Sequence, residues 1–159
     1  MEQKIMENRI EKVREYVDNV LLNMTDTVER RYAYVHLYRV AQACAMIAQK
    51  RKENVELAIA AGMLHDIFSY KTMDHQDHAH KGAVMAKEIL NELDIFDNSE
   101  TDMICDAIYN HSDKSVKQTP FNEILIDADV LQHYLYDPFL PVSESEKMRL
   151  ENLKMEFCL

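Results

Sequence analysis

Four of the seven histidines lie in one short stretch, residues 64–83, which reads LHDIFSYKTMDHQDHAHKGA. One of them, His65, is directly followed by Asp66. Neutral imidazole and carboxylate together suit manganese, iron, zinc or nickel. Adjacent side chains on a helix diverge by about 100°, but at a helix end both can lean toward one ion. The alternative is that His65 interacts with the helix C-terminus and Asp66 is solvated.

Three further polar residues fall on apolar helix faces. His36 lies on the stripe of residues 28–47, His111 shares a stripe with Ile104 and Ile108, and Asp129 lies within ILIDADVLQH. A lone histidine on such a face is more often a core residue than a ligand, but two strengthen the case for a site. A buried, unpaired carboxylate is costly, so Asp129 calls for a cation or several hydrogen-bond donors.

The elements that position these residues are predicted to be helices. Apolar residues recur at helical spacing over 3–23, 27–50, 55–68, 78–93, 99–111 and 120–136, with a short last helix after Pro141. Ser99 is expected to be an N-cap, Asp77 is a candidate cap for the helix from His78, and residues 69–77 read as polar loop. With only two glycines, the chain favours an all-α fold of about six to seven helices.

Length, charge and cysteine usage restrict the class of protein. The 159 residues fit a single domain covering 1–159. The net charge of −10 disfavours nucleic-acid polymers and anionic membranes as partners. Three widely spaced cysteines suggest neither disulfides nor a thiolate zinc site, and the charged first twenty residues do not resemble a signal peptide. We therefore expect a cytoplasmic protein without a membrane segment, as a monomer or a homodimer.

The order of these residues resembles the HD-domain metal-dependent phosphohydrolase superfamily. The resemblance rests on HLYRV around His36, LHDIF around His65 and Asp66, and DADVL around Asp129. HAHKGA at His78 and AIYNHS at His111 match two more motifs of that family. The likeness covers about residues 27–136; an N-terminal helix within 1–26 and an extension over 137–159 lie outside it.

The resemblance implies the roles of six residues. His36, His65, Asp66 and Asp129 would bind one metal ion, while His78 and His111 would bind a second, with Asp66 bridging both. Such a pair of ions holds a bridging hydroxide that attacks phosphorus, and Asp66 is accordingly also predicted to be catalytic. Manganese, iron, cobalt or nickel is expected, with zinc and magnesium still open. His75 and His80 match no family position, and His133 is either an ordinary histidine or a support for Asp129. Asp129 is preferred over Asp127 because it occupies the Ala-Asp-x-Leu position.

The chain also departs from the family pattern. Many relatives place a lysine shortly after the HD pair, where this chain has Phe68 and Ser69. Lys71 is a candidate replacement, both catalytic and substrate-binding; Arg39 and Lys114 are further candidates for substrate binding, and Lys117 is an alternative to Lys114. The Gly-Tyr-Pro segment of the cyclic-dinucleotide phosphodiesterase branch is absent.

The expected function is hydrolysis of a phosphate ester or anhydride in a small phosphorylated metabolite, a nucleotide or dinucleotide. One alternative is an HD-type diiron oxygenase, which would use the same six ligands. The other is a non-catalytic, ligand-sensing HD domain, which would have no need for the complete ligand set.

Overall fold

A computed structural model describes residues 8–159 of the chain, and these residues form α-helices without any strand. The all-α prediction is confirmed. The helices are α1 (Arg9–Leu22), α2 (Thr27–Arg51), α3 (Val55–Leu64), α4 (Ile67–Thr72), α5 (His78–Leu93), α6 (Asn98–Asn110), α7 (Pro120–Tyr136) and α8 (Glu144–Phe157). The first helix was predicted over 3–23, and the part of that range before residue 8 lies outside the described residues.

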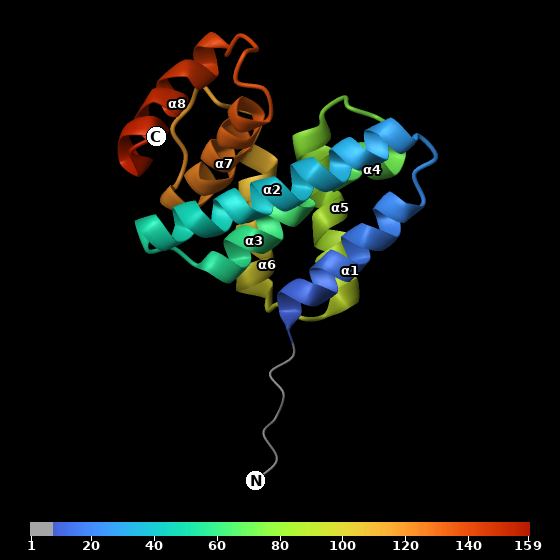
Figure 1. Ribbon diagram of the computed structural model, residues 1–159. Coiled ribbons are helices and arrows are strands. Elements are labelled where there is room, and N and C mark those ends of the chain that lie inside the picture. The colour runs from blue at the N-terminus through green and yellow to red at the C-terminus, as the bar shows by residue number, and fades with distance from the viewer. Residues whose placement is uncertain (1–7) are drawn as a thin grey trace.

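The long helix α2 crosses the middle of the molecule (Figure 1), with α7 and α8 to one side and α1, α4 and α5 to the other. It packs against α3 and α7, while α5 packs on α6. Leu37 and Ile47 of α2 are fully buried, as are Leu64 of α3 and Ile108 of α6. This shared core fixes the helices that carry the candidate site residues.

Gly62 allows α2 and α3 to approach closely. A Cβ atom built on Gly62 would lie 2.7 Å from the Cα of Ala41, inside van der Waals contact. The absence of a side chain at residue 62 therefore brings His36 on α2 near His65, which follows α3.

The segment after α3 differs from the sequence prediction. One helix was expected over 55–68 and a loop over 69–77, but the chain breaks at His65 and Asp66 and continues as α4 from Ile67 to Thr72. Tyr70 is buried, with 6% of its surface exposed. Burial of its ring stabilises a helical turn that the polar sequence around it does not reveal.

One predicted cap, Ser99, is wrong, and the other, Asp77, occupies the N-cap position without a side-chain hydrogen bond. The N-cap of α6 is Asp97, which forms a capping box with Glu100, so Ser99 lies inside the helix. The sequence did contain this signal, an acidic residue with a glutamate three positions later. Asp77 precedes α5 but its side chain makes no capping hydrogen bond, and its φ of 53° places it in the left-handed region.

Candidate metal centre

The structure brings together all six residues predicted to bind metal. They come from the middle of α2, the α3–α4 junction, the first turn of α5, the end of α6 and the middle of α7; we call them the six-residue cluster: His36, His65, Asp66, His78, His111 and Asp129. Adjacent side chains within a helix would point in different directions, but the break between α3 and α4 lets those of His65 and Asp66 face the same space. Asp66 has φ −110° and ψ 11°, outside the helical region, so its side chain turns toward the same space as that of His65.

The carboxylate of Asp66 faces two different pairs of histidines. Its Oδ2 atom lies 3.2 Å from Nε2 of His36 and 3.4 Å from Nε2 of His65. Its Oδ1 atom lies 3.6 Å from Nε2 of His78 and 3.5 Å from Nε2 of His111. One carboxylate thus offers a separate oxygen to each of two sets of imidazoles, which is the arrangement that a bridging ligand requires.

Asp129 completes the first of these sets. Its Oδ1 atom lies 3.5 Å from Nε2 of His36 and 3.8 Å from Nε2 of His65. The neighbouring carboxylate, Asp127, instead pairs with Arg51 at 2.8 Å and Arg149 at 3.1 Å. The structure therefore places Asp129, and not Asp127, at the centre.

Two features show that the cluster fits metal ions. Ligand atoms about 2.1 Å from one ion at tetrahedral angles are about 3.4 Å apart, close to the separations of 3.2–3.6 Å around Asp66. In addition, Oδ1 of Asp66 and Oδ1 of Asp129 are buried and have no hydrogen-bond partner. A cation would satisfy both oxygens, and triads from the cluster have ligand atoms all within 4.8 Å of one another.

The outer ring nitrogens hold the histidines in the orientation needed for metal binding. Nδ1 of His65 donates to the carbonyl of Gly62 over 2.8 Å, and Nδ1 of His111 donates to that of Ile108 over 2.6 Å. Since a carbonyl oxygen only accepts, these bonds place the proton on Nδ1 and leave Nε2 facing the site. Nδ1 of His36 lies 2.7 Å from Oε1 of Gln132, so a side-chain amide has the corresponding role there.

At His65 and Asp66, the surroundings favour the protonation states that bind metal, a neutral imidazole and an ionised carboxylate. Burial lowers the pKa of His65 to about 4, so its imidazole is neutral at pH 7. Burial alone would raise the pKa of Asp66, but His65, His111 and His36 outweigh that effect and hold it well below its usual range. Asp66 therefore remains an anion although it is surrounded by protein.

His36 and His111 behave differently without a cation. Burial by itself would lower the pKa of either residue, but the nearby carboxylate of Asp66 outweighs burial and raises that pKa above the usual value. A proton on Nε2 then occupies the position that a metal ion would take, so the two compete.

A cavity of about 540 Å³ opens beside the cluster. Lys114 reaches it from the loop after α6, with only 14% of its side chain exposed, and donates to Oδ2 of Asp129 over 2.8 Å and to Glu146 of α8 over 2.7 Å. Burial alone would lower the pKa of Lys114, but Asp129 and Glu146 raise it, so the ammonium stays charged. Other lining residues are Glu29, Tyr32, Ser69, Tyr70, His75, Ser112 and His133.

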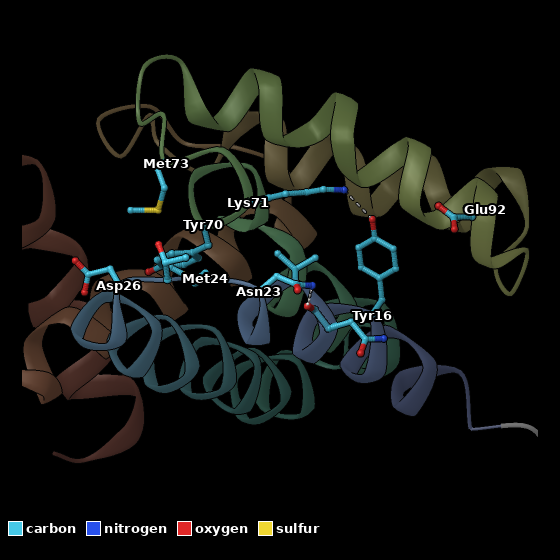
Figure 2. A pocket seen from close by; sticks show the side chains of 11 residues that line it. Tyr16, Asn23, Met24, Asp26, Tyr70, Lys71, Met73 and Glu92 are labelled. Carbon is cyan, nitrogen blue, oxygen red and sulfur yellow. Dashed lines mark hydrogen bonds between the residues drawn. The ribbon is translucent and has the colours of Figure 1, made fainter.

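The structure does not bring Lys71 or Arg39 to this cavity. Lys71 turns toward α1 and donates to the hydroxyl of Tyr16 over 3.2 Å, within a second cavity lined by α1, the loop before α2, α4 and Glu92 of α5 (Figure 2). Arg39 is exposed on α2 and is absent from the described residues that line the metal centre. Of the three predicted substrate contacts, Lys114 is the one positioned at the cluster.

Of the remaining three histidines, two line the cavity and one lies away from it. His75 lines the cavity, whereas His80 pairs with Asp77 over 2.8 Å and stacks on Tyr109 away from the cluster. His133 lines the cavity and its Nε2 lies 3.5 Å from Oδ1 of Asp129.

Glu146 and Gln132 were not predicted from the sequence. Gln132 lies three residues after Asp129 on α7, so helical periodicity could have placed it on the same side. Glu146 belongs to the segment outside the family resemblance, and its position depends on how α8 packs against α7. No local pattern marks it.

Comparisons with known proteins agree with this geometry. The family model of the HD domain matches residues 33–134, a range that contains the whole six-residue cluster. Ribonuclease Y of Lawsonia intracellularis is 33% identical over 123 residues, which are 75% of this chain and 22% of that protein. This chain therefore spans about a fifth of the length of that curated relative.

A solved structure shows the same fold. The crystal structure of a predicted HD superfamily hydrolase from an uncultured Thermotogales bacterium matches with a TM-score of 0.62 at 24% identity, covering 93% of this chain and 88% of that one. Within residues 8–159, no helix has the length and apolar character needed to cross a membrane. From the family match and the geometry of the cluster, this chain belongs to the HD domain family.

Proposed function

We propose that this protein is a metal-dependent phosphohydrolase that cleaves a phosphate ester or anhydride of a small metabolite, a nucleotide or dinucleotide. The observation that carries the proposal is the carboxylate of Asp66, whose two oxygens face separate pairs of histidines at 3.2–3.6 Å. This arrangement suits two divalent ions, for which manganese, iron, cobalt or nickel fits the nitrogen and oxygen donors. When bound, two such ions would neutralise phosphoryl charge and activate a water molecule for attack on phosphorus.

The residues around the cluster support an anionic, small substrate. Lys114 presents a buried ammonium at the cavity, which can bind a phosphate oxygen. A volume of about 540 Å³ lies within the usual range of about 300–1,000 Å³ for small-molecule sites. The net charge of −10 repels long polyanions but still permits a small phosphate compound to be attracted locally.

RNA is the second candidate substrate, because the Lawsonia relative is named a ribonuclease. The two candidates share phosphodiester or phosphoester cleavage and differ in the size of the substrate. A polymer would have to approach an acidic protein, so its binding should depend strongly on salt.

The test is a screen of phosphorylated metabolites, dinucleotides and a short RNA, with each metal added separately to metal-free protein. We expect metal-dependent release of product from one class of small substrates. Cleavage of RNA alone would replace the proposed substrate class. Consumption of dioxygen by the iron-loaded protein, with no hydrolysis in any arm, would instead identify an oxygenase.

A further inference from the structure

We propose that His133 is a seventh metal ligand, which binds the same ion as His36, His65, Asp66 and Asp129. This inference rests on the proposed function, since it assigns a further ligand to that metal centre. His133 is not part of the six-residue cluster, and one turn of α7 separates it from Asp129. Residues four apart on a helix lie on the same face, so both side chains reach the cavity together.

The position of Nε2 of His133 is that of a ligand atom. It lies 3.5 Å from Oδ1 of Asp129, the same distance that separates this oxygen from Nε2 of His36. The three atoms lie within 4.8 Å of one another. The rings of His133 and His36 are nearly parallel, at 12° and with centroids 5.3 Å apart. Two imidazoles therefore flank one carboxylate oxygen at spacings that one ion can bridge.

Asp129 provides independent support for an ion at this position. Its side chain is 7% exposed, its Oδ2 accepts from Lys114, and its Oδ1 is buried without a hydrogen-bond partner. The unpaired oxygen is the one that His36 and His133 face. Burying such an atom without a partner is unfavourable, and a cation shared with the two histidines removes this cost.

Glu146 lies behind the ring of His133. Its Oε1 atom is 3.8 Å from Nδ1 of His133 and is fixed by the bond from Lys114. Metal-binding histidines commonly have a carboxylate near the other ring nitrogen, which orients the ring and strengthens the ligand. α8, which follows the residues matched by the family model, thus contributes to the metal centre.

Five protein groups would then surround the first ion, whereas Asp66, His78 and His111 would hold the second. The second ion would keep more positions for water and substrate, and the first would be the more tightly held. His133 is also the most exposed member of its set, with 43% of its side chain accessible, so it would bind at the open side of the cavity.

The experiment uses cobalt as the probe, because its visible absorption reports the number and type of its ligands. Wild-type protein, His133→Ala and His80→Ala are loaded with cobalt, and affinity is measured by chelator competition. His80 is the matched control, since it is an exposed histidine paired with Asp77 away from the cluster. Alanine favours helix, so His133→Ala should retain α7, which circular dichroism checks.

We expect His133→Ala to alter the cobalt spectrum and to lower the affinity for the more tightly bound ion at least about tenfold. Added imidazole should restore the spectrum. His80→Ala should match the wild type. An unchanged spectrum would overturn the inference, even if affinity fell, because His133 would then only orient Asp129. Metal-dependent hydrolysis by the wild type in that case would leave the proposed function intact, whereas a wild type that binds no cobalt would overturn both.

Discussion

Lys114 donates to Oδ2 of Asp129 over 2.8 Å, and the same ammonium donates to Glu146 over 2.7 Å. An ammonium has three N–H donors, so these two bonds leave one for a ligand in the cavity. The carboxylates hold Lys114 in place and keep its charge, while Oδ1 of Asp129 remains directed at the histidines. Under the proposed function, Lys114 would contact a phosphate group of the substrate beside the metal centre.

Lys114→Met should weaken substrate binding. Loss of a hydrogen bond to a charged group costs about 1.5–3 kcal/mol, which corresponds to a rise in KM of roughly tenfold to a hundredfold. Lys117→Met is the control, because Lys117 is exposed in the same loop. Steady-state kinetics measures the effect, and equal KM values for the two variants would argue against a role for Lys114.

Removal of metal should abolish activity. The donors of the six-residue cluster are imidazoles and carboxylates suited to transition metals. The divalent charge that would act on the phosphate comes from the bound ions, so the cluster without them should not support hydrolysis. Dialysis against a strong chelator should eliminate turnover, and manganese, iron, cobalt or nickel should restore it. Full turnover by protein shown to be metal-free by elemental analysis would refute the centre.

Asp66→Ala should inactivate the protein without unfolding it. The side chain lies at the junction of α3 and α4 and is 20% exposed, so its loss removes a ligand rather than core packing. Because both sets of histidines face this carboxylate, turnover should fall on the order of a thousandfold or more. Circular dichroism should be unchanged; loss of the helical signal would mean that the metal centre is chiefly structural.

His78→Ala and His111→Ala should each lower the metal content from about two ions per chain toward one. Nε2 of each imidazole lies within 3.6 Å of Oδ1 of Asp66, the oxygen on the side of the second ion. His80→Ala is expected to retain both ions. Elemental analysis after identical loading and desalting tests this, and equal metal content in all three variants would show that His78 and His111 do not hold an ion.

Metal affinity should decrease as the pH falls. The pKa values of His36 and His111 are raised by Asp66 in the metal-free protein, so their protons compete with metal at pH values above the usual 6.5. A raised pKa means that each imidazole loses its proton only at higher pH, and only the deprotonated imidazole can bind metal. Chelator competition between about pH 8 and pH 6 should show the decline. A constant affinity would mean that these imidazoles are not ligands.

The sequence predicted the helices and the cluster better than the surroundings of the cluster. His36 and Asp129 were identifiable because polar residues on apolar helix faces stand out, and the family motifs joined them to His65. Lys71 was misplaced because the chain breaks at Asp66 and continues as α4, which turns Lys71 toward Tyr16 of α1. Glu146 was missed because long-range ion pairs position α8, such as that of Glu156 with Arg51.

The residues of the cluster come from separate helices, so a bound ion would connect these helices and restrain the whole domain. Its ligands extend along the chain from residue 36 to residue 129, and between two of them, Asp66 and His78, lies the exposed connection from α4 to α5. An ion would act there as a cross-link that fastens α5 to the α3–α4 junction. Metal-loaded protein should accordingly resist proteolytic cutting between residues 73 and 77, and cutting at that connection should accelerate when the ion is withdrawn.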